Sequence, residues 1–325
     1  MYEVSAVERL IAEGKRLLLA ADERLLQGLP RGNWIGGTIP YFMTESGGVR
    51  THEQIYVTQL PPYATVAAIK YYDEQSIRDV YVDGQPHGFS FIMIPAMSRT
   101  HLSFALQAPT YQGFATRPLV GWVTGVDLAD FGRLAPRVFD GRAGQSFSEG
   151  AIVMHVGLPP NKLAELDILN MFRQGDGEAI EFLEDSFAVR DALIAGQRRP
   201  LVDYLRERRI DTRLPLVADY AGAMLNTCFQ KVDEATGVVS FYAPVFRGVE
   251  YKLAAAEGDY VENFARRMPR LNGQHMLFSC NCVLNYLYAG LEGRKTEGIT
   301  GPVTFGEIAY QLLNQTLVYL RIADT

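Results

Sequence analysis

Apolar positions near the start of the chain follow the helical period. Over residues 3–27, apolar residues recur every three or four positions with charged residues between them. This pattern predicts one amphipathic helix. The segment GLPRGN (28–33) follows, and its glycines and proline predict that the helix ends there. Acidic residues interrupt the same stretch, so it lacks the apolar segment of a secretory signal peptide.

Short apolar runs then predict a series of β-strands. The first, WIGGTIPYFM (34–43), contains adjacent glycines, which weaken a strand unless a backbone or a ligand must approach closely. Ser98 is placed to cap a short helix over residues 99–107. Further strands are predicted at 54–60, 65–72, 119–128 and 151–158, and two strands around an Asp83-Gly84 turn are predicted within 80–94.

The pattern changes in the second half of the chain. Residues 177–195 have a helical pattern, and Pro200 begins another short helix. Gly237 predicts the loop of a hairpin over residues 232–241. Beyond it, the sequence predicts a helix over 259–268 that Asp259 caps, and a strand over 275–283 that leads into a helical stretch.

This mixture of hairpins and strand-to-helix units favours an α/β to α+β fold with mixed β-sheets flanked by helices. A chain of 325 residues is long for one core, so two related or packed domains are expected. The change of pattern near residue 200 places them at 1–199 and 200–325.

Composition narrows the function classes. The net charge of −6 argues against nucleic acid as a partner, because nucleic acid requires a basic surface. The longest apolar runs are strand-sized, well short of the ~20 apolar residues of a membrane helix. Three cysteines cannot all pair within one chain, which suits a reducing compartment. We therefore expect a cytoplasmic protein without a membrane partner.

Cys280 and Cys282 invite three chemical interpretations. On a strand they point to the same face, but a zinc site needs four ligands, and the sequence offers no second Cys/His pair. Alternate strand positions are also poorly placed for a disulfide. A nucleophilic thiol at a helix start would have a lowered pKa, yet it would need a histidine base brought near by folding. The remaining interpretation is packing at a buried strand end.

Two other segments have the composition of a binding site. In GNWIGGTIPYF (32–42), the glycine pair exposes backbone and Thr38 offers a hydroxyl, which suits either a pocket edge or a tight packing point. In GITGPVTFGEIAYQLLNQTLVYL (298–320), glycines shape a loop before Glu307. That carboxylate could cap a helix, receive an amino group or act as a base.

The C-terminal part of the chain resembles the FIST sensory domain. That family has a cysteine after an apolar strand, a Gly-Glu loop and an Asn-Gln-Thr segment before a final strand. WIGGTIPYF is similar to an N-terminal segment of the same family, although a predicted helix stands where the family has its first strand. The matching positions are Gly36, Gly37, Thr38, Cys280, Gly301, Gly306, Glu307, Ile308, Ala309, Asn314, Gln315 and Thr316.

The resemblance implies that residues 1–199 and 200–325 correspond to the N-terminal and C-terminal FIST domains. It further implies a bacterial ligand-sensing protein without catalysis or cofactor, which binds a small molecule such as an amino acid beside a separate signalling protein. The alternative is an acyl-transfer or hydrolytic enzyme that uses Cys280 or Cys282. The expected binding residues are Gly36, Gly37, Thr38, Cys280, Asn281, Gly306 and Glu307, with no metal ligand among them.

Overall fold

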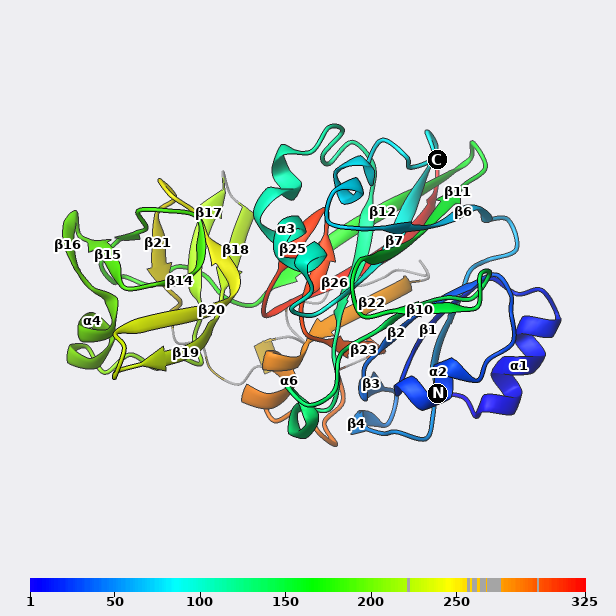
Figure 1. Ribbon diagram of the computed structural model, residues 1–325, viewed down its shortest axis with the longest axis horizontal. Coiled ribbons are helices and arrows are strands. Elements are labelled where there is room, and N and C mark those ends of the chain that lie inside the picture. Colours follow the sequence, from blue (N-terminus) through cyan, green and yellow to red (C-terminus); the bar gives the residue numbers. More distant parts are fainter. Residues whose placement is uncertain (221–222, 256–257, 259–261, 264–266, 268–275, 297) are drawn as a thin grey trace. The chain divides into compact units, whose positions relative to one another are not determined.

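The computed structural model describes residues 1–325 except 221–222, 256–257, 259–261, 264–266, 268–275 and 297 (Figure 1). The chain divides into two compact units. Unit 1 comprises Met1–Leu169, Arg267–Leu312 and Leu317–Thr325, and unit 2 comprises Asn170–Arg266 and Leu313–Thr316. The boundary predicted at 199/200 lies inside unit 2 and does not separate the units. The helix predicted over 259–268, with its cap Asp259, falls largely outside the described residues.

The first sheet of unit 1 has the strand order β10-β9-β2-β1-β5. Its strands β1 (Leu17–Ala21) and β2 (Trp34–Thr38) run parallel, with Ala21 beside Thr38 at their ends. The first strand of the predicted segment 34–43 therefore stops at Thr38, and β3 begins after Pro40. The other strands are β5 (Tyr56–Gln59), β9 (Val138–Asp140) and β10 (Gln145–Phe147).

The single helix predicted over 3–27 is wrong. The segment forms α1 (Val4–Ala12), then β1, then α2 (Glu23–Gln27). Gly14, at a φ of 71°, follows the end of α1, a conformation that glycine adopts without strain. All five residues of β1 are buried. A strand covered on both faces is apolar at every position, so its sequence cannot be told from a helix by period alone.

The second sheet of unit 1 has the order β25-β24-β8-β7-β11-β6. Its strands β7 (Gly88–Pro95) and β8 (Leu119–Thr124) run parallel. Only β7 forms within the predicted pair over 80–94, because the residues before it make a turn. The cap at Ser98 is confirmed: its hydroxyl accepts a hydrogen bond from the His101 N–H at 3.1 Å. The remaining elements are α3 (Arg99–Gln107), β6 (Thr65–Tyr72), β11 (Ala151–Gly157), β24 (Glu307–Ala309) and β25 (Gln311–Leu313).

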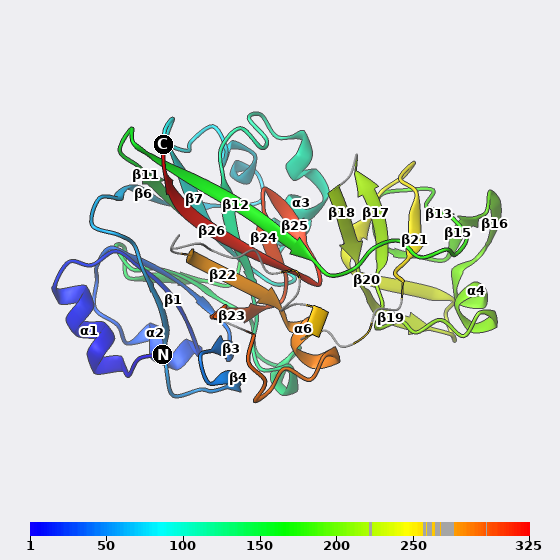
Figure 2. The same ribbon diagram turned by 180° about the vertical axis from the view of Figure 1, so that it is seen from behind.

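The third sheet of unit 1 joins segments from both ends of the chain, in the order β12-β26-β22-β23-β3-β4. Both views show β12, β26 and β22 side by side (Figures 1 and 2). Its strands run mostly antiparallel, while β22 and β23 run parallel. The elements are β3 (Tyr41–Thr44), β4 (Gly47–Arg50), β12 (Lys162–Asn170), β22 (Met276–Cys282), α6 (Val283–Tyr288), β23 (Gly301–Thr304) and β26 (Thr316–Asp324).

Unit 2 contains two antiparallel sheets, with the orders β16-β15-β13-β21-β17-β18 and β14-β20-β19. The hairpin predicted around Gly237 is confirmed, with a φ of 68° at that glycine. The elements are β13 (Ile180–Glu181), β14 (Ser186–Val189), β15 (Asp191–Ile194), β16 (Gln197–Pro200), α4 (Leu201–Glu207), β17 (Leu216–Tyr220), β18 (Ala223–Thr227), β19 (Phe229–Asp233), β20 (Val238–Val245) and β21 (Tyr251–Leu253).

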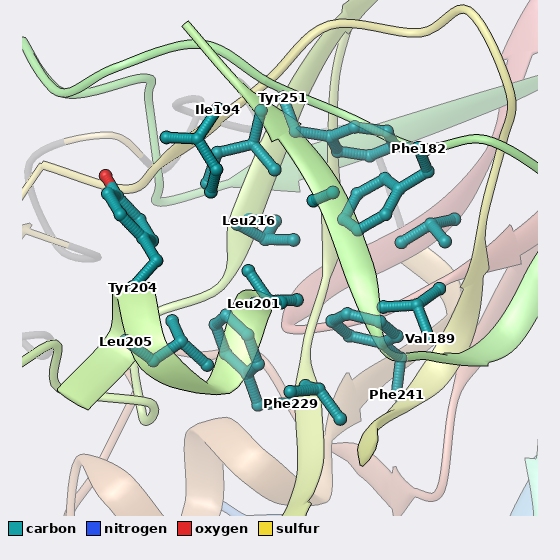
Figure 3. Close-up of a cluster of buried hydrophobic side chains, with 14 of the residues drawn as sticks. Phe182, Val189, Ile194, Leu201, Tyr204, Leu205, Leu216, Phe229, Phe241 and Tyr251 are labelled. Atoms are coloured by element: carbon teal, nitrogen blue, oxygen red, sulfur yellow. The ribbon is translucent and has the colours of Figure 1, made fainter. Parts of the chain in front are cut away.

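One buried cluster explains why the chain does not divide at residue 200. Ile194 and Leu201, on either side of that point, both pack in the core of unit 2 with Phe182, Phe241 and Tyr251 (Figure 3). The helix predicted over 177–195 is also wrong, because short strands fill that range and β15 turns into β16 through Ala195 and Gly196 with positive φ.

The mixed and antiparallel sheets with few helices confirm the expected α+β class. Among the described residues, no helix has the length and apolar character needed to cross a membrane.

Candidate functional site

A pocket of unit 1 lies where three strands end. Asp22 follows β1, Thr38 ends β2, and Asp127 comes three residues after β8. The Gly125 N–H donates to the Thr38 carbonyl at 2.8 Å, which ties the end of β8 to the end of β2. Carboxyl ends of parallel strands are common ligand sites because loops converge there. The pocket has a volume of about 540 Å³ and is lined by Asp22, Glu23, Arg24, Thr38, Ile39, Pro40, His52, Gly125, Val126, Asp127, Asp130 and Leu134.

His52 joins the two aspartates across this pocket. The β3–β4 hairpin delivers it, two residues after Arg50. Its Nδ1 lies 2.8 Å from Asp22 Oδ2, and its Nε2 lies 3.1 Å from Asp127 Oδ2. A neutral imidazole carries one N–H, so both contacts are hydrogen bonds only when the ring is protonated. The side chain is 32% exposed, which leaves one part of it open to a ligand.

Asp127 is the buried charge of the site, with a side chain 3% exposed. Its Oδ1 accepts from the Ala129 N–H at 2.9 Å and from the Tyr41 hydroxyl at 3.4 Å. Its Oδ2 contacts Arg50 Nε at 2.6 Å as well as His52. Burial alone would raise the pKa of Asp127, but the Ala129 hydrogen bond and the Arg50 charge outweigh it and lower that pKa. The carboxylate is therefore held in its charged form.

Asp22 not only contacts His52 but is also the N-cap of α2. Its Oδ1 accepts from the Arg24 backbone N–H and from Arg24 Nε, both at 3.1 Å. Burial would raise the pKa of Asp22, but the hydrogen bonds from His52 and Arg24 lower it overall. The local fold thus fixes this carboxylate before any ligand arrives.

Of the three residues predicted in β2, Thr38 lines the pocket, while the two glycines do not. Thr38 Oγ1 accepts from the Arg137 N–H at 2.9 Å. A Cβ added to Gly37 would lie 2.6 Å from Thr124 Cγ2 and 3.1 Å from Trp122 Nε1. Gly37 therefore serves the close approach of β2 to β8, which is the packing interpretation of the glycine pair.

We expect Gly37→Ala to destabilise the protein by about 1–3 kcal/mol, since the new methyl group overpacks the contact with β8. Gly36→Ala is the matched control, because its Cβ would meet its nearest atoms at 3.3 Å or more. Urea unfolding of both variants measures the difference. A Gly36 variant as unstable as the Gly37 variant would contradict the packing role of Gly37.

Cys280, Gly306 and Glu307 all lie against β8 in the interior of unit 1. Cys280 Sγ lies 3.4 Å from the Gly121 carbonyl of β8, and Glu307 pairs with Trp122 of the same strand. The Gly306 carbonyl accepts from the Val123 N–H at 2.8 Å. Burial raises the pKa of Cys280 well above its usual range, and the Glu307 charge adds to this. Cys280 and Glu307 thus lie in the same part of the buried core, and neither of them lines the pocket.

Asn281 points to the opposite face of β22 from Cys280, as alternation along a strand requires. Its Oδ1 accepts from the Cys282 N–H at 2.8 Å and from Asn285 Nδ2 at 3.0 Å. The amide therefore fastens the start of α6. The structure does not bring Asn281 to the pocket that contains Thr38.

Cysteine chemistry finds little support in this arrangement. Cys228, Cys280 and Cys282 are all free thiols and all buried. A thiol whose pKa is raised by burial is not a ready nucleophile. Across the part of the chain that the structure describes, no group of three His, Cys, Asp or Glu side chains is arranged to hold a metal ion.

Asp22, His52 and Asp127 are not among the site residues predicted from the sequence. Asp22 lay inside the predicted helix over 3–27, so its position after a strand was hidden. A polar residue directly after a buried strand is a signal for a site at the end of that strand. If β1 had been recognised as a strand, this signal would have indicated Asp22. Nothing in the local sequence around His52 indicates its two partners, which lie 30 and 75 residues away.

Comparison with known proteins places the chain in a family. The sequence model of a family of unknown function, DUF6976, matches residues 2–323, and the chain belongs to that family. No curated protein and no solved structure matches it.

Proposed function

We propose that this member of the DUF6976 family binds a small metabolite in the pocket at the ends of β1, β2 and β8, and that it acts as a sensor without catalysis. An amino acid or a similar compound is the expected ligand, and a separate signalling protein is the expected recipient of the signal. The likeness to the FIST sensory domain supports this function class. The pocket with its fixed Asp22–His52–Asp127 network is the observation that carries the proposal.

The size and composition of the pocket support binding of a small molecule. Its volume of about 540 Å³ is within the usual range of ligand sites, which is roughly 300–1,000 Å³. Ile39, Pro40, Val126 and Leu134 provide apolar contact, and the charged groups lie among them. Small-molecule sites typically combine such apolar walls with a few oriented polar groups.

The network also keeps the ordering cost of binding low. Asp127 holds His52 and Arg50, while Asp22 holds the other side of the His52 ring. Side chains that are already fixed lose little conformational freedom when a ligand binds, so more of the contact energy appears as affinity. No reactive thiol lies in this pocket, since none of the three cysteines lines it.

A thermal-shift screen of the full chain against amino acids and related metabolites tests the proposal. We expect at least one compound to raise the melting temperature, and Leu134→Ala to weaken its binding by about three- to tenfold through lost apolar contact. Leu163→Ala is the matched control, because Leu163 is similarly exposed (48% against 55%) but lies on β12, outside the pocket. Binding that is unchanged in Leu134→Ala and in His52→Gln would refute this site.

A further inference from the structure

We infer that the pocket recognises its ligand through an ammonium group, so that the ligand class is an organic amine with an apolar body. A carboxylate on the ligand is not required. This inference rests on the proposed function and specifies the chemistry of the same site. It follows from which polar atoms around the pocket already have hydrogen-bond or ion-pair partners and which acceptor atoms are still accessible to a ligand.

Asp127 has no capacity left for a ligand. A carboxylate offers about four lone-pair positions, and Asp127 uses them for Ala129 N–H, Tyr41 hydroxyl, Arg50 and His52. Its role is to hold the neighbouring groups in place. The discriminating contacts must therefore come from other lining residues.

Three other lining carboxylates retain open acceptor positions. Asp22 receives two hydrogen bonds on Oδ1 but only the His52 contact on Oδ2. Glu23 contacts Arg137 through Oε1 at 3.3 Å, and Asp130 contacts Arg133 through Oδ1 at 2.5 Å. Among the described residues, no hydrogen bond reaches Glu23 Oε2 or Asp130 Oδ2. An ammonium group has three N–H donors and no acceptor, which matches such a set.

The cations around the pocket are less available to a ligand. Arg50, Arg133 and Arg137 each already contact one of the pocket's carboxylates from outside its lining. Among the lining residues that the structure describes, Arg24 is the one arginine, and its Nε already donates to Asp22 Oδ1. Both ring nitrogens of His52 face carboxylates. A ligand carboxylate would therefore meet mainly acceptors, whereas an ammonium group would meet open oxygens.

Three probes with the same branched apolar body test this inference. At pH 7.5, 3-methylbutylamine is a cation, leucine is a zwitterion and 4-methylpentanoate is an anion. Titration calorimetry with the full chain is expected to show that the amine binds at least tenfold more tightly than the acid, and less tightly in 0.5 M than in 0.05 M NaCl. Phenethylamine, phenylalanine and 3-phenylpropanoate repeat the comparison with an aromatic body.

One isosteric double variant locates the contact. The double change Glu23→Gln and Asp130→Asn is expected to weaken amine binding by about tenfold without weakening binding of any acid. Glu13→Gln is the control, because Glu13 also pairs with a cation, Lys15, but does not line the pocket. The inference would be overturned if amine and acid bound equally well, or if the double variant bound the amine as tightly as the native chain does. Either result would leave a small-molecule site in place. A chain that binds neither amine but binds another metabolite would also overturn it, whereas a chain that binds no compound of the screen would remove the proposed function itself.

Discussion

Lowering the pH from 7 to 4.5 is expected to remove about 2–3 kcal/mol of stability for each of two buried histidines, His101 and His155. Burial lowers the pKa of both to about 4, from 6.5 in an exposed setting. Between these values the unfolded chain binds a proton at each ring while the folded chain does not. Protons therefore favour unfolding in this window, and stability is fully present above pH 6.5 and falls as the pH approaches 4.

The surroundings of each ring explain the shift. His101 lies in the first turn of α3 and is 5% exposed, and burial is the cause of its lowered pKa. His155 is 1% exposed, with Nδ1 2.8 Å from Ser90 Oγ and Nε2 2.8 Å from the Tyr72 hydroxyl. Burial lowers its pKa most, the Asp83 charge opposes this in part, and the Lys70 charge adds to it.

Urea unfolding at several pH values measures the effect, and His155→Gln tests its source. The variant is less stable at pH 7, but it should lose about 2–3 kcal/mol less than the native chain on going to pH 4.5. The carboxylates Asp22 and Asp127, with lowered pKa values, lose their contribution only below about pH 3.8 and so do not confuse this window. An identical pH dependence in His155→Gln would contradict the assignment.

The second large effect is expected at Asp127. Asp127→Ala should destabilise the protein by about 3 kcal/mol, because it leaves Arg50, His52 and the Tyr41 hydroxyl without their shared buried acceptor. It should also abolish ligand binding, since the His52 ring loses one of its two supports. Thermal and urea unfolding measure the stability of the variant. Its ligand binding is measured with the metabolite that raises the melting temperature of the native chain.

Asp130→Ala is the control for the stability part of this prediction. Asp130 lies on the same loop and also pairs with an arginine, but its side chain is 34% exposed, so its loss should change stability by less than about 1 kcal/mol. Similar stability losses in the two variants would show that the loop, rather than the buried carboxylate, matters. Asp127→Asn preserves the shape and should fall between the native chain and Asp127→Ala.

Local signals in the sequence predicted several elements well. The Ser98 cap, the Gly237 hairpin and the short helix after Pro200 depend on one residue whose conformation or hydrogen bonding is decided within a few neighbours. The failures over 3–27 and 177–195 have a different origin. In both, the tertiary structure buries a strand or turns the chain within the segment, and that outcome depends on residues far along the sequence.

Of the residues that line the pocket, the sequence indicated one that lies on a single recognisable strand. Thr38 ends a recognisable strand and lines the pocket, whereas Cys280, Asn281, Gly306 and Glu307 lie in the interior or on another face. Asp22, His52 and Asp127 become a unit only when β1, β4 and β8 are assembled. The residues next to His52 in the sequence do not indicate that its ring contacts two carboxylates from distant segments.

The position of β26 has a consequence for synthesis of the protein. This strand lies between β12 and β22 in its sheet, yet among the strands that the structure describes within residues 1–325 it is synthesised after β12, β22 and all the others. Until residues 316–324 are made, the edges of β12 and β22 that pair with β26 remain unpaired, and for β12 this period includes the synthesis of β13 to β21. Such waiting edges recruit other chains. Premature termination shortly before residue 316 should therefore yield a product that depends on chaperones, although it contains most of residues 1–325.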